Sequence, residues 1–268
     1  MAERLISAAV AIMLLFAVLY VNCVMNIKIA IYVIAILALI ALHEMYKPLG
    51  IVKHKSLCAV GILMTLAVIF DGTHTEIAVS IAVMLFFAAA VFKHKEIKFN
   101  TICTALFSAL YISFGFHYLE NMLRREYGLG MLFFVLIAAF ITDSGAYFVG
   151  RAIGKHKLAP ELSPKKTIEG SAGGVVFSVI AIFIYKYIMQ SAYGGIQLNT
   201  VNIIVDVVIA AVVGEIGDLS ASLVKRELNI KDYGKIMPGH GGVLDRFDSI
   251  LFVAPTVYFL DMILPIIH

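Results

Sequence analysis

The sequence contains little charge and few cysteines, and both shortages exclude classes of protein. Asp, Glu, Lys and Arg make up 15% of the 268 residues, whereas hydrophobic residues make up 61% and the mean hydropathy is +0.95. A soluble domain is closer to half apolar, so the composition indicates an integral membrane protein. The three cysteines, Cys23, Cys58 and Cys103, are odd in number and form no CxxC pair, which argues against a disulfide or a zinc site.

Nine apolar stretches are long enough, or nearly so, to cross a bilayer, which takes about 20 helical residues. Lipid cannot satisfy exposed backbone amides, so each span has to be helical. We therefore predict an all-α integral membrane protein with about nine transmembrane helices. The first stretch is taken as a span and not as a signal peptide, because no small-residue cleavage site follows it. The nine stretches are residues 5–21, 27–42, 57–70, 77–92, 101–118, 129–149, 172–189, 201–224 and 250–267.

Most of the cations lie in the connections after the second, fourth, sixth and eighth stretches. These connections hold 16 of the 21 Lys and Arg residues, so the positive-inside rule predicts that they face the cytoplasm. Two of them are long, residues 151–171 and 225–248, and chemistry on water-soluble substrates has to use them. We expect residues 1–128 to form a scaffold of about five helices and residues 129–268 to form the catalytic region.

Apart from Asp206, which lies near the predicted outer end of the eighth stretch, three acidic residues interrupt the sixth and eighth stretches, where a carboxylate is costly and is a functional candidate. Asp143 lies in the sixth stretch, and Glu215 and Asp218 lie in the eighth. Helical spacing places Asp218, Ser222 and Lys225 on one stripe, with Glu215 about one turn earlier. Taken singly, Asp143 or Glu215 could also be a hydrogen-bonded structural residue or part of a proton path.

The segment KIMPGHGGVLDRFD, residues 235–248, is polar and rich in glycine between two apolar stretches. Its aspartates offer the hard oxygen ligands that suit Mg²⁺, and Lys and Arg clamp phosphate oxygens. Glycine-rich backbone can turn its N–H groups toward an anion. The combination favours a metal-bridged nucleotide at the membrane surface. Singly, His240 could be an ordinary loop histidine, and Lys165 and Lys166 could be lipid-headgroup contacts.

Residues 222–248 resemble the C-terminal signature of the phosphatidate cytidylyltransferases, also called CDP-diacylglycerol synthases. Residues 142–174 are similar to a second conserved stretch of that family, although Ile168 stands where the family often has Trp. The signature positions matched here are Ser222, Lys225, Arg226, Lys231, Asp232, His240, Gly241, Gly242, Asp245, Arg246 and Asp248.

The resemblance implies an enzyme of phospholipid biosynthesis that joins CTP and phosphatidic acid to give CDP-diacylglycerol and pyrophosphate. It implies Mg²⁺ as cofactor, with a monovalent cation such as K⁺ as a second ion to test. The site would open to the cytoplasm from the bacterial cytoplasmic membrane. CTP, phosphatidic acid and membrane lipids are the expected partners, nucleic acid is not, and a homodimer is left open.

The resemblance also assigns roles to residues. The expected metal ligands are Asp218 and Asp245, with Asp143 and Asp248 as secondary candidates for the same shell. The expected catalytic group is Asp218, Asp245, Lys225, Arg226, Asp248 and His240. The expected substrate-binding group is Ser163, Lys165, Lys166, Thr167, Ser222, Lys231, Asp232, Gly241, Gly242 and Arg246.

The two basic clusters are expected to differ in rigidity. Pro160, Pro164 and Gly170 bracket residues 163–167, which predicts a flexible loop, whereas Lys225 is expected on a helix. Rigid elements hold reacting groups more tightly than loops do. We therefore expect Lys225 to affect kcat, and Lys166 to affect mainly KM for one substrate.

Two alternative functions stay open at this point. Another CTP-using lipid enzyme, such as a polyprenol kinase or an archaeal-type cytidylyltransferase, would share the nucleotide chemistry. An ion-coupled transporter would also use carboxylates within the membrane, but it would predict inverted repeats and paired broken helices. The sequence contains neither of these features.

Overall fold

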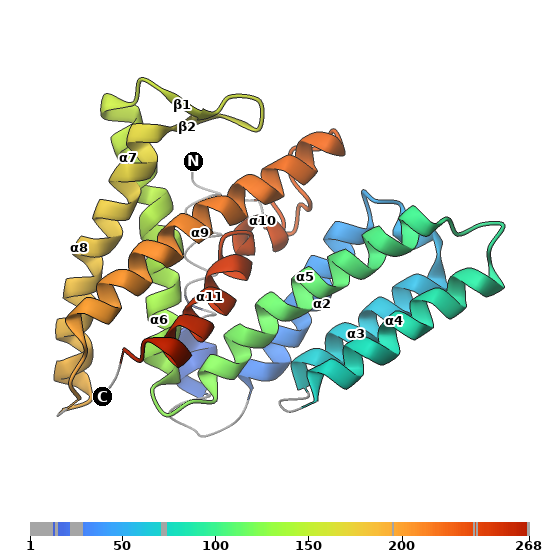
Figure 1. Cartoon of the computed structure of the whole chain (residues 1–268), viewed down its shortest axis with the longest axis horizontal. Coiled ribbons are helices and arrows are strands. Elements are labelled where there is room, and N and C mark those ends of the chain that lie inside the picture. Colours follow the sequence, from blue (N-terminus) through green and yellow to red (C-terminus); the bar gives the residue numbers. More distant parts are fainter. Residues whose placement is uncertain are drawn as a thin grey trace. The chain divides into compact units, whose positions relative to one another are not determined.

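The computed structural model describes Met13 and residues 16–21, 29–70, 74–194, 196–237, 239 and 241–266. Nearly all regular structure in these residues is helical (Figure 1). The chain forms two compact units, and each combines segments that are distant in sequence. The first unit contains Met1–Asn121 and Leu228–Phe247, and the second contains Met122–Glu227 and Asp248–His268.

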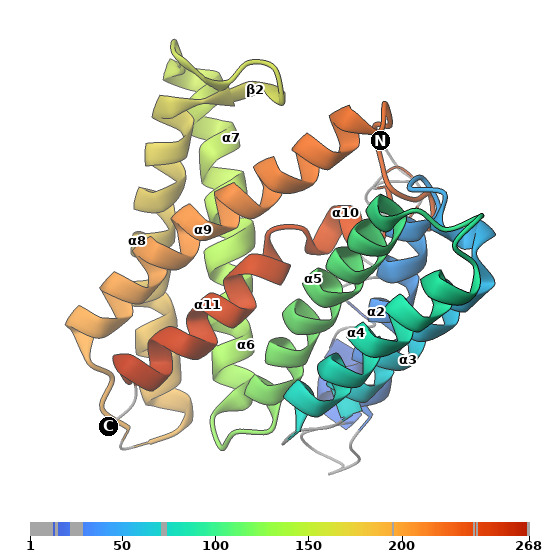
Figure 2. The same ribbon diagram turned by 45° about the vertical axis from the view of Figure 1, so that its right-hand side comes forward.

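Apolar helices and short helical turns build the first unit (Figure 2). Buried contacts between apolar helices hold it together: the Tyr46 hydroxyl donates to the Ala105 carbonyl oxygen at 2.9 Å, and the rings of Phe116 and Phe247 lie 5.2 Å apart. The latter contact fixes α10 against α5. The elements are α2 (Ala30–Tyr46), η1 (Ile51–Lys53), α3 (Lys55–Phe70), α4 (Thr75–Phe92), most of α5 (Phe99–Leu123) and the one-turn helix α10 (Leu244–Phe247).

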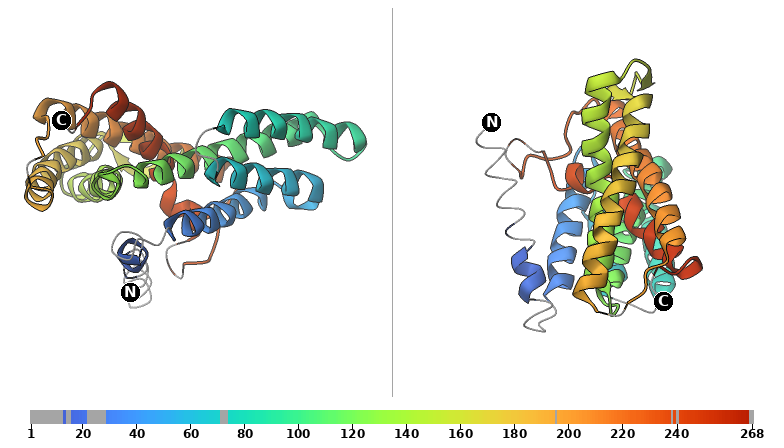
Figure 3. Two further views of the ribbon diagram at one scale, coloured as in Figure 1. Left: turned by 90° about the horizontal axis from the view of Figure 1, so that it is seen from below. Right: turned by 90° about the vertical axis from the view of Figure 1, so that its left-hand side faces the viewer.

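The second unit consists of a helical rod, a small hairpin and three further helices. The rod contains a π-helical turn that ends two residues before Asp143, and such turns are frequent at functional sites. Helices α7 and α8 run side by side (Figure 3), and α11 packs on α9. The elements are α6 (Gly128–Leu136), η2 (Ile137–Ile141), α7 (Thr142–Ile153), β1 (Lys157–Ala159), β2 (Ser163–Thr167), α8 (Ile168–Ala192), α9 (Thr200–Glu227) and α11 (Ile250–Ile263).

The helical content agrees with the predicted all-α membrane class. Within the described residues, five helical segments are long and apolar enough to cross a bilayer: α4, α5, the α6–α7 rod, α8 and α9. Helices α2 and α3 are shorter apolar helices. The count of nine spans, the domain boundary after residue 128 and the cytoplasmic side of the connections stay predictions. Most of the first predicted span, residues 5–21, lies outside the described residues.

The connection at residues 151–171 differs from the flexible loop predicted there. It forms an antiparallel hairpin in which Lys157 pairs with Thr167 and Ala159 pairs with Ser163. The Thr167 hydroxyl oxygen then accepts the Gly170 N–H at 3.1 Å and caps α8. The Glu169 carboxylate accepts the N–H groups of the two residues before β1. Lys166 is therefore held on a strand that continues into a capped helix.

Candidate active site

The second unit contains a cavity of about 460 Å³ formed by α7, the β1–β2 hairpin, α8 and α9. Acidic residues come from α7 and α9, and cations come from the end of α7 and from the hairpin. Both charge types that the sequence predicts for a nucleotide site therefore line one cavity. Its polar lining consists of Asp143, Tyr147, Arg151, Lys157, Lys165, Lys166, Thr167, Ser171, Glu215 and Asp218.

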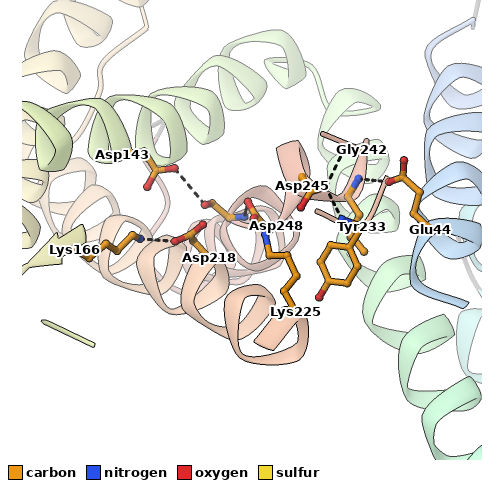
Figure 4. Close-up of polar contacts among 11 residues, drawn as sticks. Glu44, Asp143, Lys166, Asp218, Lys225, Tyr233, Gly242, Asp245 and Asp248 are labelled. Atoms are coloured by element: carbon orange, nitrogen blue, oxygen red, sulfur yellow. Dashed lines mark hydrogen bonds and ion pairs between the residues drawn. The ribbon is translucent and has the colours of Figure 1, made fainter. Parts of the chain in front are cut away.

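An ion pair between β2 and α9 is the shortest charged contact in the cavity. Lys166 Nζ lies 2.7 Å from Asp218 Oδ2, and the side chains are 21% and 25% exposed (Figure 4). Burial alone would lower the pKa of Lys166, but the Asp218 carboxylate, helped by Asp143 and Glu215, raises it above its ordinary value. Lys166 is therefore a firmly charged cation among three carboxylates.

The other two carboxylates of the cavity are held by hydroxyl groups. Ser249 donates to Asp143 Oδ2 at 3.5 Å, and Ser171 donates to Glu215 Oε2. Glu215 is buried, and its second oxygen has no hydrogen-bond partner among the described residues. The acidic patch predicted from the sixth and eighth stretches is thus present as a three-dimensional cluster.

A second pair of opposite charges lies at the C-terminal end of α9, the end predicted to face the cytoplasm. Lys225 Nζ, in the last turn of α9, is 3.9 Å from Asp248 Oδ2. Burial, followed by the neighbouring Asp218 charge, raises the pKa of Asp248 to about 7, while Lys225 and the Ser249 N–H oppose this shift. The helix extends through Arg226, whose Nε donates to the Leu162 carbonyl oxygen at 3.3 Å. The unbroken helix keeps Asp218, Ser222 and Lys225 at the predicted helical spacing, and Arg226 at its end contacts the hairpin.

Asp245 lies in the first unit, on α10, and is engaged by backbone amides. Its Oδ2 accepts the N–H groups of Tyr233 at 2.8 Å and Gly242 at 2.9 Å. Asp245 is 7% exposed, and Gly241 beside it adopts φ +88°. These hydrogen bonds give Asp245 a role in shaping the glycine-rich segment.

Comparison with known proteins identifies the family. The profile described as "Cytidylyltransferase family" matches residues 2–264. The chain belongs to this family. It is 42% identical over 192 residues to a protein named phosphatidate cytidylyltransferase from Bacillus subtilis (strain 168), covering 71% of this chain and 69% of the relative. Relatives of the same name from Staphylococcus haemolyticus (strain JCSC1435) and Staphylococcus aureus (strain COL) are 35% and 34% identical, each covering 84% of this chain and 86% of the relative.

Membership of the cytidylyltransferase family confirms the resemblance found in the sequence, while the roles of single residues stay predictions. The structure distributes the predicted site residues over both units, and His240 lies outside the described residues. The second unit holds Asp143, Ser163, Lys165, Lys166, Thr167, Asp218, Ser222, Lys225, Arg226 and Asp248, and the first unit holds Lys231, Asp232, Gly241, Gly242, Asp245 and Arg246.

Several residues that shape the site were not among those predicted. Arg151 and Lys157 line the cavity, and their place in the basic connection was the available signal. Glu215 was noted in the sequence but given no role, although it is buried beside Ser171. Glu44, on α2, accepts backbone hydrogen bonds from the signature region, and only its position at the end of an apolar stretch could have drawn attention to it.

The donor chemistry of the cavity fits Mg²⁺ in type. Among the described residues, no group of three or more His, Cys, Asp and Glu side chains is arranged to hold a metal ion. Mg²⁺ needs no such cage, because it keeps several waters and takes one or two carboxylates together with substrate phosphates. Asp218 and Asp143, which line the same cavity, are sufficient hard oxygen donors for that mode of binding.

Proposed function

We propose that this chain transfers CMP from CTP to phosphatidic acid and so produces CDP-diacylglycerol and pyrophosphate. The observation that carries the proposal is the cavity, where Lys166 lies among the carboxylates of Asp143, Glu215 and Asp218. Two polyanionic substrates require cations, and a nucleotide bound through a metal requires carboxylates. Relatives named phosphatidate cytidylyltransferase, which match most of the chain, supply the substrate class.

The reaction joins a lipid phosphate oxygen to the α-phosphorus of CTP. The bond between the α-phosphorus and the bridging oxygen breaks, and pyrophosphate leaves with that oxygen. A phosphate monoester has a second pKa of about 6 and is largely ionised at neutral pH, so the attack needs no strong base. Positioning and charge neutralisation then supply most of the catalysis, as in other phosphoryl-transfer sites.

The cations of the cavity are assigned to phosphate binding. Three cavity residues, Lys165, Lys166 and Arg151, are assigned to contact phosphate oxygens. Lys225 on α9 is assigned to the reacting phosphates. Lys166 is neutralised by Asp218 when no phosphate is bound. The ion pair with Asp218 therefore holds the Lys166 side chain in the cavity before substrate binds. A phosphate group that enters the cavity would then be a second anionic partner for Lys166.

Asp218 and Asp143 are assigned to hold Mg²⁺, with Asp248 of the same unit as a further candidate ligand, and the metal-binding role expected for Asp245 stays a prediction. Mg²⁺, when bound, would neutralise charge on the CTP phosphates and favour departure of pyrophosphate. A monovalent second cation such as K⁺ stays a prediction without a chosen ligand set.

The protein is assigned to the bacterial cytoplasmic membrane, with about nine spans and the cavity open to the cytoplasm. Nucleotide and pyrophosphate are water-soluble, whereas the lipid substrate stays in the bilayer, so the site has to be accessible from both. The concentration of Lys and Arg in residues 151–171 and 225–248, which hold 10 of the 21 cations, supports the cytoplasmic side.

The proposal is tested with purified protein in mixed micelles that contain CTP, phosphatidic acid and Mg²⁺. Mass spectrometry should detect CDP-diacylglycerol, and its formation should stop when EDTA removes the metal. A polyprenol kinase would instead phosphorylate polyprenol, and a transporter would leave CTP intact. The proposal would be rejected if folded protein formed no CDP-diacylglycerol in this assay.

A further inference from the structure

A glutamate from the N-terminal half holds the backbone of the signature segment (residues 231–247) in the first unit. Glu44, near the end of α2, is 4% exposed. Its Oε1 accepts the N–H of Val243 at 3.1 Å and its Oε2 accepts the N–H of Leu244 at 2.8 Å (Figure 4). The two amides lie 199 and 200 residues after Glu44 in the chain.

Two glycines of the signature segment make room for this carboxylate. A Cβ atom at Gly234 or at Gly242 would overlap the Glu44 carboxylate at a distance that real Cβ atoms do not reach. The signature segment therefore surrounds the Glu44 carboxylate with two N–H donors and with two glycines that leave space for it. The close approach of Gly242 to the Glu44 carboxylate involves no substrate, and a side chain at position 242 would require Glu44 to move.

The same turn also contains Asp245. Its carboxylate accepts the N–H of Gly242, and Glu44 accepts the next two N–H groups, those of Val243 and Leu244. Three consecutive amides are thus divided between one acid of the signature segment and one acid from α2. Leu244 is the first residue of α10 and Asp245 is the second, so the bonds to Glu44 fix the turn from which Asp245 projects.

A glycine-rich turn gains little rigidity from its own sequence, because glycine populates many backbone conformations. Buried N–H groups also have to find acceptors. Glu44 meets both needs, since it satisfies two amides and selects one conformation of the turn. Catalysis by positioning is sensitive to displacements of about 1 Å, and supporting residues decide whether a site keeps its geometry.

We propose that Glu44 is a positioning residue for cytidylyl transfer, which holds the signature segment so that Asp245 and its neighbours are presented in one conformation. This inference rests on the proposed function only for its effect on turnover. The contact between Glu44 and the turn can be tested without substrates.

The first test uses Glu44→Gln, which keeps the size of the side chain but replaces one acceptor oxygen with an NH₂ donor. Hydrogen exchange measured by mass spectrometry should show faster exchange at Val243 and Leu244 and unchanged exchange in α3. In steady-state assays kcat should fall by roughly 10-fold or more, while KM for CTP changes less than about 3-fold. Glu76→Gln, at an exposed position on α4, is the matched control and should match the parent protein.

The second test asks whether Glu44 is what excludes a side chain at position 242. Gly242→Ala should lower the melting temperature and accelerate exchange in the signature segment. Glu44→Asp withdraws the carboxylate by one methylene, so the variant that combines Glu44→Asp with Gly242→Ala should be more stable than Gly242→Ala alone. If the decreases in melting temperature simply add in the double variant, another contact excludes the Cβ atom. This result would overturn the proposed close contact between Gly242 and Glu44.

The two proposals fail in different ways. If the parent protein makes no CDP-diacylglycerol but Glu44→Gln still accelerates exchange of the Val243 and Leu244 amides, the proposed function is rejected and the contact stands. If Glu44→Gln leaves exchange at Val243 and Leu244 unchanged, the contact is rejected. If exchange accelerates in Glu44→Gln while its kcat equals that of an active parent protein, the positioning role is overturned.

Discussion

The ion pair between Lys166 and Asp218 makes a prediction about stability whose size follows from the structure. Lys166→Met removes the cation but keeps an apolar side chain of similar length. Asp218 then loses the cation that lies 2.7 Å from its Oδ2, while Asp143 and Glu215 still line the cavity. Removing one partner of a buried ion pair costs about 3–5 kcal/mol, because the remaining charge is left without compensation.

Partial exposure reduces that cost here. The two side chains are 21% and 25% exposed, so water partly screens the charge that remains. We therefore expect the free energy of unfolding to fall by about 2 kcal/mol. In a protein of this size each kcal/mol moves the melting temperature by about 2–4 °C, which gives a decrease of about 4–8 °C. The double variant Lys166→Met with Asp218→Asn removes both charges and should recover about half of the decrease.

The assay is thermal unfolding in detergent followed by tyrosine fluorescence, since the chain has 12 tyrosines and no tryptophan. Lys165→Met is the matched control, because Lys165 is an exposed neighbour on the same strand. The reasoning is refuted if Lys166→Met melts at the parent temperature. It is also refuted if the double variant melts no higher than Lys166→Met.

The remaining predictions concern activity, pH dependence and orientation. Asp218→Asn should lower turnover by roughly 100-fold or more at saturating Mg²⁺ while the protein still accumulates in membranes; near-normal turnover would remove Asp218 from the metal site. Burial raises the pKa of Asp248 to about 7, so its contribution to stability is present below its ordinary pKa of about 4 and is lost as pH rises through 7. Asp248→Asn should therefore melt higher than the parent protein at pH 8, with a smaller gain at pH 5, and equal gains at both values would contradict this titration. Single cysteines at positions 157 and 235 should resist an impermeant reagent applied to the outside of intact cells, and labelling of both would place the two connections on the outer face.

The helices were accessible to sequence reasoning because their signals are local. A run of apolar residues in lipid has to be helical, and the stripe of Asp218, Ser222 and Lys225 follows from helical spacing. The β1–β2 hairpin escaped prediction because its strands are three and five residues long and contain three lysines and Pro164, with Thr167 as their one β-branched residue. Contacts outside the strands, such as the Glu169 carboxylate on the N–H groups before β1, help to hold it.

The hairpin changes the expectation for Lys166. A flexible loop predicted an effect mainly on KM, but the structure holds Lys166 on a strand and against Asp218. We now expect Lys166→Met to lower kcat as well as to raise KM, because the residue lies among the carboxylates assigned to the metal.

Long-range contacts were the part that the sequence could not reveal. The sequence indicates that Asp245 belongs to an acidic and glycine-rich signature, but it does not show that Asp245 accepts backbone amides. It gives no sign that Glu44 meets amides almost 200 residues later. Such partners are chosen by tertiary packing, and a single sequence contains no local pattern that reports them.

The most direct measurement of the central claim follows the phosphorus atoms of CTP. Purified protein is incubated with phosphatidic acid, Mg²⁺ and CTP labelled at either the α- or the γ-phosphorus, and the lipid is then extracted. Transfer of CMP predicts that the α-label enters the lipid fraction and that the γ-label stays in water as pyrophosphate. Appearance of the γ-label in lipid, with the α-label left in water, would identify a kinase and contradict the account.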